Sequence, residues 1–148
     1  IQRRFTKIFS IKKRDFYDDY AHHPTEIEAV IDSVRQVYKK RKIVCVFQPH
    51  RFSRIKFLRN EFASAFKKSD TVVLCPVYSA GEKKKYNFNQ YKFSKFIAKN
   101  SQTQVINILN KNELLVYFNK NLVEDELVIC MGAGSISNWI REISTKLR

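Results

Sequence analysis

The chain has 148 residues, a length that fits one domain with a substantial buried core. Hydrophobic residues make up 44% and charged residues 28%, and no apolar run approaches the roughly 20 residues needed to cross a bilayer, so we expect a soluble globular protein rather than a membrane protein. The formal net charge of +14 excludes an acidic chain and raises the question of a polyanion partner.

The chain begins at Ile1, and its only methionine is Met131. Because a natural reading frame begins with Met, we expect this chain to be a piece of a longer protein. A signal peptide is not indicated, since Arg3, Arg4 and Lys7 are followed by alternating residues rather than by an apolar block.

Two short strands and a helix are predicted at the start of the chain. Weak alternation over residues 1–13 predicts a strand or hairpin, and residues 14–17 predict a strand that leads into an acidic pair. Pro24 suits the first turn of a helix, where its missing N–H costs nothing. Apolar residues then recur at helical spacing, so we expect a helix from Pro24 to about Lys40.

The rest of the chain alternates between strands and helices. Apolar runs that suit strands buried on both faces of a parallel sheet lie at residues 43–47, 71–75 and 127–131, with a shorter run at 105–108. Helical spacing is found at 58–66, 93–97, 114–118 and 136–143, and a loop is expected over 76–90. The predicted fold class is therefore α/β, a doubly wound, mostly parallel, Rossmann-like sheet with helices on both faces, formed by residues 1–148 as one domain.

Cys45, Cys75 and Cys130 each lie inside an apolar strand-like run. They are odd in number and lack metal-ligand spacing, so no metal site is predicted for them. Buried, reduced thiols of a cytoplasmic protein explain them best.

Ionisable residues gather at residues 18–26, between a strand and a helix, where open α/β folds bind ligands. A carboxylate such as Asp19 can accept hydrogen bonds from both hydroxyls of a ribose, although a loop or helix-capping acid is an equal alternative from the motif alone. Tyr20, His22 and His23 could be packing residues, but two adjacent histidines beside two acids favour a site.

A second polar stretch, residues 47–54, also follows an apolar strand run. If the two strands are parallel neighbours, both loops emerge at one sheet edge, and His22, His50, Arg51 and Arg54 would lie over Asp19. Two arginines three residues apart on one helical turn could grip a carboxylate or phosphate. A solvated basic loop is the alternative, since a strongly basic chain has many such loops.

The sequence Gly132-Ala133-Gly134 follows the last strand and opens the last helix. Its amides could cradle an anion, but it lacks the dinucleotide fingerprint and the P-loop sequence. A tight turn permitted by glycine is favoured. No nucleophile lies beside a base, so the chain carries no complete catalytic site.

Five stretches, in this order, resemble the C-terminal domain of the Mur ligase family over essentially the whole chain. They are RRF at 3–5, DDYAHHPTE at 18–26, FQPHRFSR at 47–54, VYSAGE at 77–82 and GAGSI at 132–136. Each is weak alone, and the five together are specific. Within the family the chain is most similar to the branch that adds L-alanine to UDP-N-acetylmuramate.

The resemblance implies an ATP-dependent ligase of peptidoglycan synthesis that works through an acyl phosphate. It implies that Arg4 and Asp19 contact ATP, with Asp19 on the ribose. It implies that L-alanine is received by Tyr20, His22, His50, Arg51 and Arg54. The N-terminal domain that binds the UDP sugar is missing, and so is the central ATPase domain with most of the Mg2+ ligands. We therefore expect the chain alone to be inactive.

Three alternatives stay open. The nearest is the sister ligase that recycles a whole tripeptide onto the same sugar. Another is a basic nucleic-acid-binding module, which the charge of +14 permits. Aromatic and basic residues are not interleaved as in RNA-binding proteins, and a general use of lysine explains the charge better, so we expect no nucleic acid and no membrane as partners. The third is a stand-alone nucleotide-binding domain without chemistry.

Overall fold

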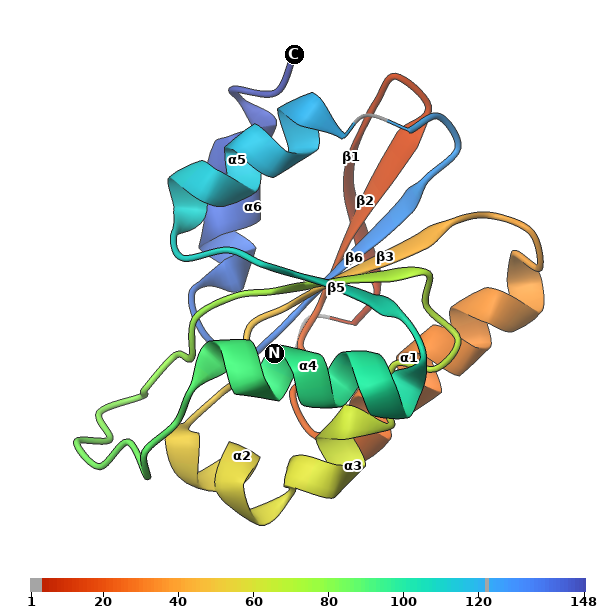
Figure 1. The fold of residues 1–148 in the computed structure, drawn as a ribbon. Coiled ribbons are helices and arrows are strands. Elements are labelled where there is room, and N and C mark those ends of the chain that lie inside the picture. The colour runs from red at the N-terminus through yellow and green to blue at the C-terminus, as the bar shows by residue number, and fades with distance from the viewer. Residues whose placement is uncertain (1–3, 122) are drawn as a thin grey trace.

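The computed structural model describes residues 4–121 and 123–148, which fold around one six-stranded sheet (Figure 1). The strand order is β1-β2-β6-β3-β4-β5. β1 pairs antiparallel with β2, and every other neighbouring pair is parallel. The strands are β1 (Thr6–Ile11), β2 (Arg14–Asp19), β3 (Ile43–Phe47), β4 (Thr71–Leu74), β5 (Gln104–Asn107) and β6 (Leu127–Met131).

Helices cover both faces of the sheet, as predicted (Figure 1). One face is covered by α1, α2, α3 and α4, and the other by α5 and α6. The helices are α1 (Pro24–Val37), α2 (Phe52–Phe57), α3 (Arg59–Ala63), α4 (Gln90–Ser101), α5 (Lys111–Lys120) and α6 (Ile136–Ser144). None of them is long and apolar enough to cross a bilayer.

The two central strands explain why the core has two halves. All five residues of β3 and all five of β6 are buried. Successive strand side chains point to opposite faces, so Cys45 and Phe47 join the cluster beneath α1, whereas Val44 and Val46 join the cluster beneath α6. The prediction of strands buried on both faces is confirmed.

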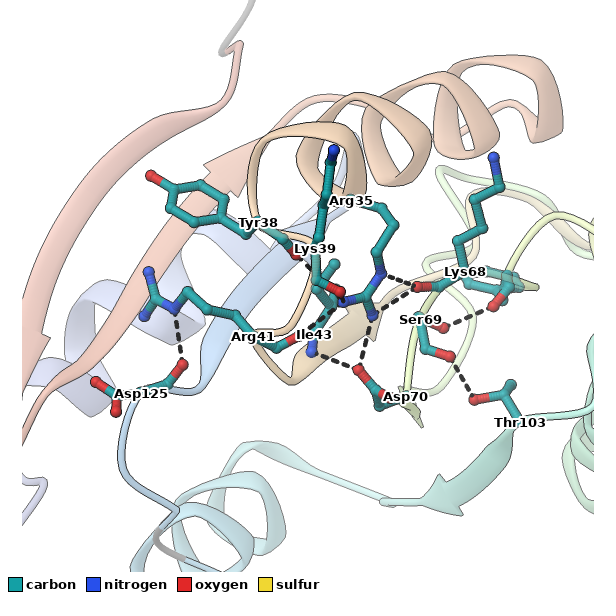
Figure 2. A network of polar contacts seen from close by, with 11 residues as sticks. Arg35, Tyr38, Lys39, Arg41, Ile43, Lys68, Ser69, Asp70, Thr103 and Asp125 are labelled. Atoms are coloured by element: carbon teal, nitrogen blue, oxygen red, sulfur yellow. Dashed lines mark hydrogen bonds and ion pairs between the residues drawn. The ribbon is translucent and has the colours of Figure 1, made fainter.

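The first helix is shorter than expected. It ends at Val37, and Tyr38 leaves the helical conformation with φ −113° and ψ 76°. The guanidinium of Arg35 donates to the backbone oxygens of Tyr38 at 3.3 Å and Arg41 at 2.7 Å (Figure 2). These bonds satisfy two carbonyls that follow the helix end and have no partner within the helix, so they stabilise the turn toward β3.

Figure 2 shows that Arg35 also binds residues 68–70, which lead into β4. Its Nη2 donates to the carbonyl of Lys68 at 2.9 Å and to the carboxylate of Asp70 at 2.8 Å. The same Asp70 oxygen accepts from the backbone N–H of Ile43 at 2.9 Å. The network therefore joins the end of α1 to the starts of β3 and β4, at the sheet edge where these strands begin.

The helix predicted around residues 58–66 is also different. The chain forms two short helices, α2 and α3, with a break at Leu58, which has φ −120° and ψ 26°. The apolar residues Phe62, Ala65 and Phe66 are buried as expected. After the break, α3 packs against α4 (Figure 1).

Candidate functional site

The carboxyl ends of β2, β6, β3 and β4 meet at one edge of the sheet because these strands are parallel. The loops after β2 and β3 were expected to follow neighbouring strands. The strands β2 and β3 are not neighbours, because β6 lies between them. The two loops nevertheless emerge at the same edge, one strand apart.

Asp19 lies at the end of β2 and is only 7% exposed. Its Oδ2 accepts from the backbone N–H of Phe5 and its Oδ1 from that of Ala21, both at 2.8 Å. A carboxylate offers about four acceptor positions, so these two bonds leave capacity for further donors. The side chain borders a hollow of about 260 Å³ lined by Arg4, Asp19, Tyr20, Ala21, Glu26, Ala29 and Val30.

Asp18 points to the other face of the sheet, as strand geometry requires. It is fully buried, and its Oδ2 accepts from the hydroxyl of Ser137 at 2.7 Å and from Arg141 at 3.0 Å. Asp18 therefore links β2 to α6 through these bonds, and its role is structural.

His22 and His23 begin α1 in different ways. His23 is the N-cap residue, and the carboxylate of Glu26 accepts from the backbone N–H groups of His22 and His23 at 3.3 and 3.2 Å. The Nδ1 of His22 lies 3.0 Å from the carbonyl of Tyr20, which can only accept, so Nδ1 carries a proton. The rings of Tyr20 and His22 meet edge to face, with centroids 5.2 Å apart.

His50 joins the loops after β2, β3 and β4. Its ring centroid lies 5.4 Å from that of His22 and 5.7 Å from that of Tyr78, on which it stacks. The loop is fixed by hydrogen bonds of 2.8 Å from Tyr78 N–H to the Pro49 carbonyl and from Arg51 N–H to the Tyr78 carbonyl. Burial, followed by the neighbouring charges of His22 and Arg54, lowers the pKa of His50 below 6.5, so the ring is neutral at pH 7.

Arg51 and Arg54 do not share one helical turn as expected. Arg51 precedes α2 and has a left-handed φ of 70°, a conformation that costs energy for a residue other than glycine. Its Nε lies 3.6 Å from the carboxylate of Glu82. Hydrogen bonds from the hydroxyl and N–H of Ser53 hold the pKa of Glu82 below its usual value, so this carboxylate is ionised beside Arg51.

Two buried nitrogen atoms in this region lack a hydrogen-bond partner within residues 4–121 and 123–148. They are Nδ1 of His50 and Nη1 of Arg54. Leaving such a group unpaired costs about 1–3 kcal/mol, so native proteins seldom do so without a reason. A ligand with acceptor oxygens, such as a carboxylate, would satisfy the arginine.

The expected residues thus form two neighbouring sets rather than one set over Asp19. The first set, with Arg4, Asp19 and Tyr20, borders the hollow beside α1. The second set is formed by His22, His50, Arg51 and Arg54, joined by Tyr78 and Glu82. Sequence reasoning gave no role to Tyr78 or Glu82, although their stretch follows a strand that ends at the same edge.

The glycine turn after β6 is closely packed. A Cβ on Gly134 would lie 2.4 Å from the ring of Tyr78, and one on Gly132 would lie 3.0 Å from the carbonyl of Gln48. The side chain of Gln48 already accepts from the first N–H of α6, that of Ile136, at 3.0 Å. These contacts support the interpretation as a tight turn.

Alignments with named proteins extend over almost the whole chain. It is 47% identical, over 97% of its length, to UDP-N-acetylmuramate--L-alanine ligase of Pelagibacter ubique, and 38% identical, over 92%, to the protein of that name in Fusobacterium nucleatum. Among solved structures, UDP-N-acetylmuramate-alanine ligase of Thermotoga maritima matches 99% of the chain with a TM-score of 0.76 and 26% identity.

The chain spans about 30% of the length of these three proteins, at 31%, 28% and 30%. A single domain of a Haemophilus ducreyi protein, described as a putative UDP-N-acetylmuramate:L-alanyl-gamma-D-glutamyl-medo-diaminopimelate ligase, has the same fold and extent. The match covers 98% of this chain and 100% of that domain, with a TM-score of 0.72 and 20% identity. Residues 3–134 match the family described as Mur ligase, glutamate ligase domain, and the chain therefore belongs to this family.

Proposed function

We propose that this chain is the C-terminal domain of an ATP-dependent ligase that adds L-alanine to UDP-N-acetylmuramate. The observation that carries the proposal is the 47% identity, over 97% of the chain, to a protein named for that reaction. The two residue sets at the sheet edge support it, because one suits a ribose and the other suits a carboxylate.

In the proposed reaction, the muramic acid carboxylate takes the terminal phosphoryl group of ATP and becomes an acyl phosphate, with release of ADP. The amine of L-alanine then attacks the acyl carbon, and phosphate leaves as the amide bond forms. ATP supplies the phosphoryl group that turns a poor leaving group into a good one. This domain contributes by positioning two of the three substrates.

The hollow beside α1 is proposed to hold the nucleoside part of ATP. Its chemistry fits, since Asp19 keeps acceptor capacity for ribose hydroxyls while two backbone N–H groups hold its carboxylate in place. Arg4 lines the same hollow and would add a positive charge for the phosphates.

The second set is proposed to receive L-alanine. The buried Nη1 of Arg54 would donate to the carboxylate, with Arg51 adding positive charge nearby. His50, being neutral, would not repel the ammonium group of the amino acid. His22 would line the remaining side, together with Tyr20 of the first set, whose ring meets that of His22.

We further propose that the UDP-sugar domain and the central ATPase domain complete the site. Mg2+ would be held mainly by the central domain, and the substrates place the reaction in the cytoplasm. The greater length of the named relatives supports this division.

The test compares two conservative variants in the full-length ligase. Arg54→Lys keeps the charge but loses the planar donor pair, so we expect the KM for L-alanine to rise roughly tenfold, with the KM for ATP little changed. Asp19→Asn is expected to do the reverse. Each variant is the other's control, and equal effects on both KM values would contradict the assignment.

The sister ligase is tested in the same assay by offering the tripeptide in place of L-alanine. Turnover with the tripeptide but not with L-alanine would overturn the choice of substrate and leave the two residue sets in place.

A further inference from the structure

A second hollow, of about 280 Å³, lies between α2 and the segment that leads into α4. It shares no lining residue with the hollow beside α1. One wall comes from residues 52–59 and the other from residues 85–92, which form the end of the extended loop before α4 and its first turn (Figure 1). Nothing in the proposed ligase reaction uses it.

The inner surface of this hollow is apolar and aromatic. Ile55 is 1% exposed, and the rings of Phe52 and Phe88 meet edge to face with centroids 5.7 Å apart. Tyr86 adds a third ring, held in a left-handed conformation with φ 54°. A planar ring could be accommodated against such a surface.

Every charged side chain that lines the hollow is a cation: Lys56, Arg59, Lys85 and Lys92. Within residues 4–121 and 123–148 none of the four forms an ion pair with a carboxylate. Lys56 lies 5.1 Å from the Tyr86 ring and Arg59 lies 4.6 Å from the Phe96 ring. Four uncompensated positive charges around one hollow attract an anion.

Lys92 is placed against the preference of its own helix. It lies in the first turn of α4, which contains no acidic residue, whereas α1 and α5 have Glu26 and Glu113 in their first turns. The positive end of the helix dipole disfavours a cation there. A binding role would account for a lysine at a position that weakens its own helix.

We propose that this hollow binds a small phosphorylated ligand that carries a planar ring, a nucleotide in its simplest form. The phosphate would lie among Lys56, Lys85 and Lys92, and the ring against Phe52 and Phe88. The limited volume favours a mononucleotide over a nucleic acid chain.

The test is a titration of the 148-residue chain with ADP, followed by amide NMR. A domain of the same extent was crystallised alone, so the fold does not need further domains. We expect the amides of residues 86–92 to shift, and to shift less with adenosine or pyrophosphate alone. Unmoved signals at millimolar ADP would overturn the proposal. Signals of Asp19 and Ala21 report the other hollow separately.

A matched pair of variants tests the role of charge. Lys92→Glu and Lys99→Glu change the charge equally at the two ends of α4, and Lys99 does not line the hollow. We expect Lys92→Glu to weaken ADP binding roughly tenfold while raising the Tm by roughly 1–4 °C. Lys99→Glu should leave binding nearly unchanged. Equal loss in both variants would mean diffuse attraction only and would overturn the site.

A short single-stranded oligonucleotide completes the test. If it bound more tightly than ADP, with a steep loss of affinity in salt and the same sensitivity to Lys92→Glu, a nucleic acid surface would replace the small ligand. Weaker binding than ADP supports the proposal.

Discussion

Asp18 and Asp19 are adjacent and chemically identical, yet they contribute to different parts of the molecule. Asp18 is fully buried and bound to Ser137 and Arg141, so its charge is used to hold α6. Asp19 faces the opposite side of the sheet and borders a hollow. From the motif alone a ribose contact and a structural role were equally open, and the family resemblance implied the ribose for Asp19. Alternation along β2 explains why the two side chains lie on opposite faces.

His50 makes the folded state sensitive to acid. Its pKa is lowered, first by burial and then by His22 and Arg54, so the unfolded chain binds a proton near pH 6.5 while the folded chain does not. The unfolded state therefore binds more protons between pH 6.5 and the lowered pKa. We expect the free energy of unfolding to fall as the pH drops through this range, as measured by urea unfolding.

The control for this prediction is His50→Gln, which cannot titrate and should lose this part of the pH slope. An NMR titration of the imidazole gives the same information directly. A midpoint at or above pH 6.5, or an unchanged slope in the variant, would contradict the prediction.

Gly134 supports the position of Tyr78. An added Cβ would lie 2.4 Å from Cγ of that ring, so Gly134→Ala must displace Tyr78 from its stack on His50. We expect a loss of about 1–3 kcal/mol in unfolding free energy, together with loss of the NOE between the two rings.

Gly81→Ala is the matched control for this change. Gly81 has φ +86°, but a Cβ there would meet nothing within 4 Å. It should cost stability through backbone strain alone and leave the Tyr78–His50 stack intact. If both variants kept the stack, the contact at Gly134 would not position Tyr78.

The helices and strands could be predicted wherever burial gives a simple hydrophobic pattern in the sequence. β3 and β6 have the predicted bounds of 43–47 and 127–131, because a strand covered on both faces gives an uninterrupted apolar run. The end of α1 was not predictable. Val37 fits the apolar spacing but is 72% exposed, and the chain turns there because Arg35 binds carbonyls from other segments.

The residue types of the candidate site could be proposed from the sequence, but their arrangement could not. The positions His22, His50 and Arg54 follow from polar residues at strand ends. The insertion of β6 between β2 and β3 and the pairing of Arg51 with Glu82 depend on contacts between segments far apart in sequence. The sequence around each of these residues carries no signal for the strand order or for the Arg51–Glu82 pair.

The network around Arg35 gives a test at the scale of an element. Arg35→Lys keeps one charge but cannot reach the Arg41 carbonyl, the Lys68 carbonyl and Asp70 together. We expect the unfolding free energy to fall by about 2 kcal/mol, measured by chemical denaturation.

A double-mutant cycle with Asp70→Asn separates the ion pair from the carbonyl bonds, since asparagine can still accept from the N–H of Ile43. The cost of Arg35→Lys should exceed the coupling energy with Asp70. If Arg35→Lys lowered the unfolding free energy by less than about 0.5 kcal/mol, the hydrogen bonds of the guanidinium would contribute little to stability.

At the scale of the whole molecule, the two residue sets lie at one edge of the sheet, and in the proposed function they supply recognition without a complete reaction centre. Paired loops and packed rings hold His50 and Tyr78 in place before any ligand binds. Such preorganisation is useful in a site shared between domains, because closure then has to align only rigid parts. Under the proposed function, this domain would hold substrates while another part of the longer enzyme carries out phosphoryl transfer.

This division of labour predicts that the isolated 148-residue chain binds nucleotide without turning it over. With ATP, L-alanine, UDP-N-acetylmuramate and Mg2+ supplied together, we expect no release of phosphate above the background. ATP should still shift the amide signals of Asp19 and Ala21, weakly, because the proposed central domain is absent. Asp19→Asn should remove those shifts without unfolding the chain. Phosphate release by the isolated chain, abolished by Arg54→Lys, would mean that the reaction centre lies within this domain and that the proposed sharing between domains is wrong.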